Sequence, residues 1–228
     1  MARDDMFIVR QSSLPAVGES NPERAVINRM GFQVVSDFIT QLTLSGYAYH
    51  MQLGTEDAGV NSTTAIDDQL ASMVADNVAG KAMIPLLYEV TPGVISTATL
   101  VQAMLELDKD KVRYTAGGTA YVPANLRGDD NNSASGSFYV GPDVTIAAKS
   151  AVPNSVEFAR KFYLEDALAD TIGYPGAWEA CVYSARNRPI AVLIDAASIV
   201  GHFGSATADV TGYAVLQFAQ FDKALVSP

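Results

Sequence analysis

The sequence predicts an all-β domain, built as a sandwich or a barrel, and three observations predict it. Clusters of Gly, Pro, Asn and Asp, which favour turns, recur at short intervals from residue 46 onward. Most segments between these clusters carry the alternating apolar pattern of strands. The length of 228 residues and the 49% hydrophobic content are sufficient for one large core.

The turn clusters divide the chain into many short segments, as in sandwiches and barrels. They are Gly46, Gly54, Pro92-Gly93, Gly117-Gly118, 128–132, Gly141-Pro142, Pro153-Asn154, Pro175-Gly176 and Asn187-Arg188-Pro189. Residues 1–31 precede them and are interrupted by Pro15, Pro22 and two glycines. We therefore predict an extended N-terminal arm over residues 1–31 and a β domain over residues 32–228.

Two segments admit both a helix and a strand. Residues 67–80 fit a short helix capped by Asp67, or a strand and a turn over 76–80 that lead into 81–90 as a hairpin. The hairpin is the favoured interpretation. Residues 156–169 begin like a strand and end with residues that suit a helical turn, and the pattern leaves this alternative open.

Two further segments have the periodicity of strands. In 101–107 the odd-numbered residues are Val, Ala, Leu and Leu, while Gln102 and Glu106 fall on the opposite face. In the second, Val112 and Tyr114 alternate with Lys111, Arg113 and Thr115. Both patterns predict strands with one apolar face.

The C-terminal segment is apolar on both faces. Tyr213, Val215 and Phe221 share one face, and Leu216 and Phe218 share the other. Such a strand is covered twice, once by its own domain and once by another element, for which a neighbouring subunit is one candidate. The charged fraction of 18% lies below the ~25% of typical domains, which fits either a covered surface or a well-packed monomer with long polar loops.

The charge and the single cysteine exclude several classes of protein. A formal net charge of −10 disfavours nucleic acid as the main ligand. Cys181 alone forms neither an intrachain disulfide nor a cysteine metal cluster. The first ten residues lack the apolar run of a signal peptide, and no apolar stretch reaches the ~18 residues of a membrane span. We therefore expect a reducing, soluble compartment.

The sequence carries no recognisable catalytic or cofactor motif. Its two histidines, His50 and His202, both lie among apolar residues, so packing roles are expected for them. It contains no G-x-S-x-G, no Gly-Lys-Ser/Thr and no G-x-G-x-x-G. The prediction is a protein without enzymatic activity, catalytic residues, cofactor or metal.

One polar turn leaves a bound ion open. Residues 128–132 include Asp129 and Asp130, whose oxygens suit Ca²⁺, but they lack the alternating spacing and closing Glu of an EF-hand loop. Because polar turns of this kind are usually solvated, we assign no metal there.

Several segments resemble strands of single jelly-roll virion proteins. Residues Ile84–Val90 look like an early strand, Val112–Arg127 follow it, and Pro189–Asp195 with Ser198–Phe221 are similar to the last two strands. The resemblance covers residue 82 to the end of the chain and is to structural proteins of tailless icosahedral viruses.

This resemblance implies a jelly-roll sandwich of two four-stranded antiparallel sheets with Greek-key connections, assembled into an icosahedral capsid. It further implies a homo-oligomer in the virion, assembled in the host cytoplasm, with copies of itself and other virion proteins as partners. The arm carries four arginines and four acidic residues, so it is expected to reach a neighbouring subunit rather than a genome. The residues are Arg3, Asp4, Asp5, Arg10, Glu19, Glu23, Arg24 and Arg29.

Jelly rolls also occur in lectins and cupins, so the fold alone does not decide the function. The alternative is a carbohydrate- or receptor-binding module of the lectin or fibre-head type. Tyr174 and Trp178 are the loop aromatics that could form its binding platform. A metal-binding cupin would need several histidines, which this chain lacks.

Overall fold

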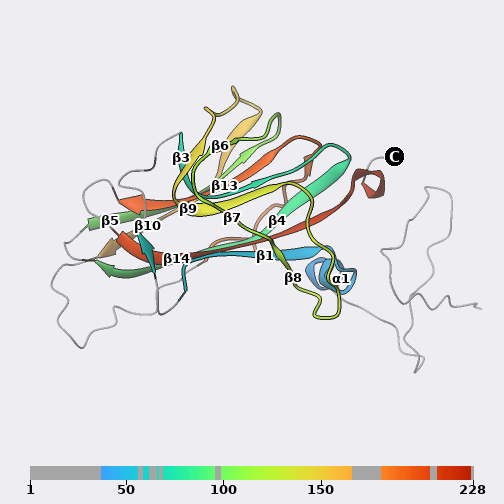
Figure 1. Cartoon of the computed structure of the whole chain (residues 1–228), viewed down its shortest axis with the longest axis horizontal. Helices are drawn as coiled ribbons and strands as arrows, with labels where there is room; N and C mark the ends of the chain where they lie inside the picture. The colour runs from blue at the N-terminus through green and yellow to red at the C-terminus, as the bar shows by residue number, and fades with distance from the viewer. Residues whose placement is uncertain are drawn as a thin grey trace, which may run out of the picture.

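The computed structural model describes residues 37–55, 59–61, 66, 69–95, 99–165, 181–205 and 210–226. These residues form two antiparallel β-sheets packed face to face, with one short α-helix and one 3-10 turn (Figure 1). The all-β prediction is therefore confirmed. The predicted arm over 1–31 lies outside the described residues.

The first sheet, called here the β14 sheet, is centred on its longest paired strands, β4 and β14. Its main strands, in spatial order, are β11 (Cys181–Ser184), β4 (Lys81–Ile95), β14 (Val210–Asp222), β1 (Ala48–Leu53) and β8 (Ala124–Asn125). Two short strands pair at its margins, β12 (Leu193–Ile194) with β4 and β2 (Val60–Asn61) with β14.

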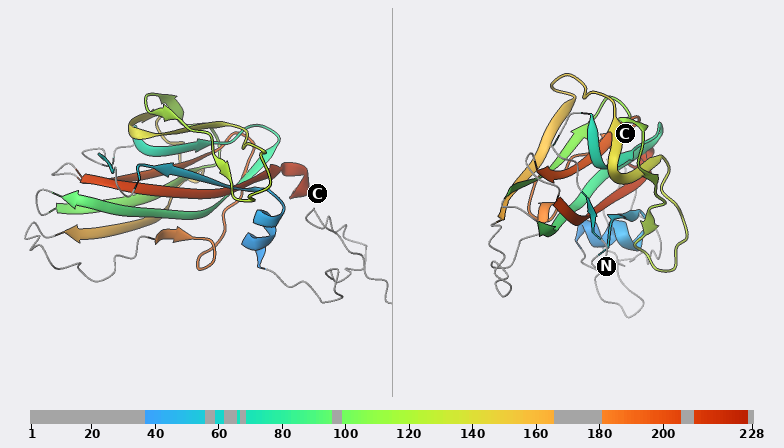
Figure 2. Two further views of the ribbon diagram at one scale, coloured as in Figure 1. Left: turned by 60° about the horizontal axis from the view of Figure 1, so that its bottom comes forward. Right: turned by 60° about the vertical axis from the view of Figure 1, so that its left-hand side comes forward.

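The second sheet, called the β5 sheet, faces the first (Figure 2). Its strands, in spatial order, are β10 (Ser155–Glu165), β5 (Thr99–Asp108), β13 (Ser198–Ser205), β3 (Leu70–Asp76), β9 (Ser137–Ile146) and β6 (Tyr114–Ala116), with β7 (Thr119–Ala120) paired to β9. Within the described residues each sheet thus has seven strands, and the predicted four per sheet is wrong. The extra strands come largely from residues 109–154, which contribute β6 to β9.

The core lies between the sheets, where alternate side chains of both meet. Val101, Ala103, Leu105 and Leu107 of β5 are fully buried in the main apolar cluster, as their period of two predicts. From the facing sheet, Phe218 stacks on Phe138 with ring centroids 5.4 Å apart. A single apolar cluster therefore joins the two sheets.

The first described element is α1 (Phe38–Leu44), which packs beside β1. Asp37 caps it, because its Oδ1 accepts a hydrogen bond from the Thr40 backbone N–H at 2.9 Å. Its apolar residue Leu42 is fully buried in the main cluster. The helix thus adds a short cover to the end of the sandwich where β1 begins (Figure 2).

The strand interpretation of residues 67–80 is confirmed, but the hairpin is wrong. The chain forms β3, turns at 77–80 and enters β4, yet β3 pairs within the β5 sheet and β4 within the β14 sheet. The connection therefore crosses between sheets. Residues 155–165 form β10, which decides the second alternative in favour of a strand over that range.

Two of the predicted turns are irregularities inside strands. Pro92 and Gly93 lie within β4, where the pairing with β14 shifts register, and Gly141 and Pro142 lie within β9, where the pairing with β3 shifts. Gly141 has φ +151°, and a Cβ there would approach the Gly118 Cα to 3.1 Å. Glycine is required at this bulge rather than at a chain reversal.

The two-sided burial of the C-terminal strand is partly explained within the chain itself. Leu216 and Phe218 are fully buried. On the face predicted to hold Tyr213, Val215 and Phe221, only Phe221 is buried, and the other two are half-buried. The ring of Tyr47 lies 5.8 Å from that of Phe221, so Phe221 needs no neighbouring subunit to cover it. The last two long strands are β13 and β14, and residues 189–195 contain only the two-residue β12, which corrects the expected strand boundary.

Candidate functional site

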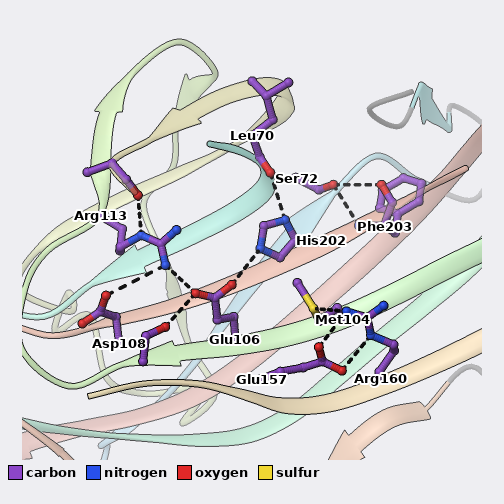
Figure 3. Close-up of polar contacts among 12 residues, drawn as sticks. Leu70, Ser72, Met104, Glu106, Asp108, Arg113, Glu157, Arg160, His202 and Phe203 are labelled. Carbon is purple, nitrogen blue, oxygen red and sulfur yellow. Dashed lines mark hydrogen bonds and ion pairs between the residues drawn. The ribbon is translucent and has the colours of Figure 1, made fainter. Parts of the chain in front are cut away.

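A cluster of buried charged residues lies on the face of the β5 sheet that points away from the other sheet (Figure 3). Glu106 lies between the core residues Leu105 and Leu107 and therefore points to the opposite face. The segments 109–113 and 147–154 contact this face through Arg113, Ala147 and Ser150, and the Glu106 side chain is only 3% exposed. The members of the cluster are 0–3% exposed: Asp76, Glu106, Asp108, Arg113 and His202.

Arg113 is the cation of this cluster and is fully buried. It donates from Nη1 to Glu106 Oε1 at 2.6 Å and from Nε to the Ala147 carbonyl at 2.6 Å, and Nη1 lies 3.9 Å from Asp108 Oδ2. The sequence predicted that Val112 would lie on the buried apolar face and Arg113 on the exposed one. The reverse is found, since Val112 is 46% exposed and Arg113 is buried. The ion pair decides which face is buried, because a buried guanidinium requires carboxylate partners.

Two aspartates attach residues 109–154 to the sheet through backbone N–H groups. Asp76 accepts from the backbone N–H of Arg113 at 3.0 Å and of Tyr114 at 2.9 Å, and also from the Ser198 hydroxyl. Asp108 accepts from the backbone N–H of Ser150 at 2.8 Å. Both ends of the covering segment are therefore bound to carboxylates of the strands beneath it.

Glu106 connects the cluster to the neighbouring strands. Its Oε1 also accepts from the Ser155 hydroxyl at 2.9 Å, and its Oε2 lies 3.9 Å from His202 Nε2. His202 Nδ1 lies 2.9 Å from the Leu70 carbonyl, so this nitrogen carries the proton. The structure places His202 as a packed residue of β13 rather than as a surface histidine.

A pocket of about 300 Å³ lies beside this cluster, over the outer face of the paired strands β5 and β10; we call it the β5–β10 pocket. Strand β5 contributes Gln102, Met104 and Glu106, and β10 contributes Glu157 and Arg160. Ser155, the first residue of β10, also lines the pocket, as do Ile66 and, from the chain before β10, Lys149, Ser150 and Val152. The pocket therefore combines the carboxylate of the buried cluster with exposed charged groups at the margin of the sheet.

The polar wall of this pocket is held in place before any ligand arrives. Arg160 pairs with both carboxylate oxygens of Glu157, at 2.7 and 2.6 Å. The same guanidinium donates to Gln102 Oε1 at 3.3 Å. It also contacts Met104 Sδ at 3.2 Å (Figure 3). Fixed planar groups of this kind can bind a ligand without reorganising.

The other residues singled out in the sequence lie away from this pocket. His50 is half-buried on β1, with Nε2 3.5 Å from Gln52 Oε1. Asp129 pairs with Arg127 at 2.6 Å, a hydrogen bond that lowers the pKa of Asp129, and Asp130 accepts from the Asn132 backbone N–H at 2.9 Å. Tyr174 and Trp178 lie outside the described residues.

No group of three or more His, Cys, Asp or Glu side chains suited to a metal occurs in the part of the chain that the structure describes. Nor does that part contain a helix long and apolar enough to cross a membrane.

The charged cluster was missed in the sequence, although it left a signal. Glu106 interrupts an otherwise apolar run, and two residues later Asp108 ends the strand. Periodicity places Glu106 on the polar face but does not show that this face is covered.

No protein-family model, curated protein or solved structure matches the chain. The functional argument therefore rests on its own geometry.

Proposed function

We propose that this chain is the structural subunit of a viral capsid, built on a single jelly roll and assembled through contacts between copies of itself. The observation that carries the proposal is the order of the strands. Apart from β2, β12 and the strands of residues 109–154, eight strands remain: β1, β3, β4, β5, β10, β11, β13 and β14.

Numbered one to eight in chain order, these strands are divided between the sheets in a regular way. The β14 sheet holds them in the order one, eight, three, six, and the β5 sheet in the order two, seven, four, five. Successive strands alternate between sheets except four and five, which pair with each other. This winding is expected of two Greek keys folded into a jelly roll, and it supports the proposal.

An exposed apolar surface supports a contact with other subunits. The apolar tip comprises Val78, Ile194, Leu225 and Val226, which are 36–45% exposed. Hydrogen bonds hold their segments together: Lys223 N–H donates to the Gly80 carbonyl and Asp195 N–H to the Lys81 carbonyl. Large apolar side chains gathered at one end of a molecule are typical of a protein interface.

The direct test of the proposal is the mass of the purified full-length protein. We would measure it by size-exclusion chromatography with light scattering over a range of protein and salt concentrations, followed by electron microscopy. Closed shells or discrete ring-shaped oligomers would support a capsid subunit. A monomer under every condition, including in the presence of other proteins of the same virion, would contradict it.

The apolar tip predicts a specific assembly defect. Replacing Ile194 and Leu225 together by lysine should reduce the assembled fraction at least about tenfold, because each buried interface side chain contributes roughly 1–3 kcal/mol. Folding should be unaffected, since both side chains are exposed in the monomer. Val122→Lys is the matched control, because Val122 is 76% exposed but lies outside the tip. Equal assembly of the double variant and this control would show that the tip is no interface.

The arm over residues 1–31 predicts a second assembly defect. Deleting residues 1–30 should block assembly and leave the circular dichroism spectrum of the β domain intact, because the arm is proposed to contact a neighbouring subunit. Closed shells formed by the truncated protein would refute this role for the arm.

The proposal assigns no catalytic activity and no cofactor to the chain. The alternative, a lectin-type or fibre-head module, rests on Tyr174 and Trp178 and stays a prediction. A glycan-binding signal lost in Trp178→Ala would favour it.

A further inference from the structure

The β5–β10 pocket has the size and the mixed chemistry of a site for a small polar ligand. Its volume of about 300 Å³ is at the lower end of the range for ligand pockets. That space accommodates one sugar ring rather than a large cofactor. The pocket lies outside the core, on the face of the β5 sheet where Glu106 is buried.

The described residues that line the pocket carry balanced charges. Lys149 and Arg160 supply two cations, and Glu106 and Glu157 supply two carboxylates. An anion such as phosphate would be repelled by the carboxylates, and an ammonium group would be repelled by the cations. The electrostatics therefore favour a neutral ligand that both donates and accepts hydrogen bonds.

Glu106 offers an acceptor at the floor of the pocket. Its side chain is 3% exposed, and Oε1 is already bound by Arg113 and Ser155. In the part of the chain that the structure describes, Oε2 makes no hydrogen bond; its distance of 3.9 Å to His202 Nε2 is too long for one. A ligand hydroxyl could donate to this oxygen, in a setting that excludes competing water.

The walls offer the remaining contacts of a hydroxylated ring. Arg160 is held between Glu157 and Gln102. Four of its five N–H groups already donate to Glu157, Gln102 and Met104, which leaves one N–H on Nη1 for a ligand. Met104 lines the pocket, and Phe162, 53% exposed, lies beside it with its ring 5.8 Å from the Arg160 guanidinium carbon. A sugar hydroxyl can accept from the remaining Arg160 N–H, while the C–H face of a sugar packs on apolar side chains.

We propose that the β5–β10 pocket binds a neutral monosaccharide unit through Glu106, Gln102 and Arg160. This proposal does not rest on the loop aromatics Tyr174 and Trp178.

The test is titration of the full-length protein with D-glucose, D-galactose, D-mannose and N-acetyl-D-glucosamine, followed by saturation-transfer NMR and calorimetry. Binding of at least one sugar in the millimolar range is expected, as for other small polar ligands. Arg160→Ala should weaken it about tenfold or more, because a hydrogen bond to a charged group is lost. Val152→Trp should also weaken it, since Val152 is 86% exposed at the mouth and the larger side chain would fill the opening.

Arg127→Ala is the matched control, because Arg127 forms a similar exposed ion pair with Asp129 but lies outside the pocket. It should leave the sugar affinity unchanged. The proposal is overturned if none of the four sugars binds, if inorganic phosphate binds instead, or if Arg160→Ala and Val152→Trp fold normally and bind like the unmodified protein. Assembly measured on the same samples separates this outcome from failure of the capsid proposal.

Discussion

Phe218→Asp is expected to abolish the folded state. Phe218 is fully buried on β14, with its ring centroid 5.7 Å from that of Tyr49 and 5.4 Å from that of Phe138 in the other sheet. Removing such a ring costs about 3–5 kcal/mol, and burying an unpaired carboxylate adds several more. The sum is comparable to the whole stability of a domain, about 5–15 kcal/mol.

Urea unfolding monitored by circular dichroism would measure this effect. Phe162→Asp is the matched control, because Phe162 is 53% exposed at the margin of the β5 sheet. It should lose less than about 1 kcal/mol. A Phe218→Asp protein that unfolds at the same urea concentration as this control would show that Phe218 does not join the two sheets.

Arg113→Met is expected to destabilise the protein by about 3–5 kcal/mol, because it leaves buried carboxylates without their cation. Glu106 and Asp108 lie beside Arg113, and the side chains of all three are at most 3% exposed. The loss should also be visible locally. Hydrogen exchange of the Tyr114 and Ala147 backbone amides should accelerate, since Tyr114 is bound to Asp76 and Ala147 to the Arg113 carbonyl.

Two further variants test whether the destabilisation by Arg113→Met comes from the burial of the ion pair and from its charge. Arg127→Met removes an exposed partner of Asp129 and should cost less than about 1 kcal/mol. Arg113→Met combined with Glu106→Gln should be less destabilised than the sum of the two single variants, because the uncompensated charge on Glu106 is removed with the cation. Strict additivity would mean that Arg113 stabilises the segment by packing rather than by its ion pair.

The buried cluster links the fold to both proposals. Asp76, Asp108 and Arg113 hold the segments 109–113 and 147–154 on the outer face of the β5 sheet, which a simple eight-stranded sandwich would leave open. The same cover buries Glu106 and shapes one side of the β5–β10 pocket. One set of ionic contacts thus completes the surface of the proposed shell subunit and prepares the proposed sugar site.

Strand periodicity was sufficient to predict the buried side chains wherever one face of a strand packs against the core. The burial of Val101, Ala103, Leu105 and Leu107 follows from their spacing, because side chains alternate across a strand whatever its partner. The turns at Gly46 and at Gly117-Gly118 were also predictable, since positive φ angles favour glycine. At Gly141, however, the same residue type marks a bulge, which depends on the facing strand β3.

Strand pairing could not be read from local patterns. Residues 70–90 form a strand, a turn and a strand, as a hairpin does, and yet β3 and β4 join different sheets. A hairpin and a crossover have the same local sequence requirements, so the choice depends on which distant strands complete the sheets. Here β3 pairs with β13, and β4 pairs with β14.

Composition and alternation alone established an all-β chain with a large core, because they depend only on neighbours along the sequence. The identity of the buried charges was decided by the tertiary structure. Val112 and Arg113 exchange their expected positions because Glu106, seven residues earlier, lies on a face that the segments 109–113 and 147–154 contact. An ion pair becomes worth burying only when the rest of the chain has excluded water from both partners, and no local pattern records that.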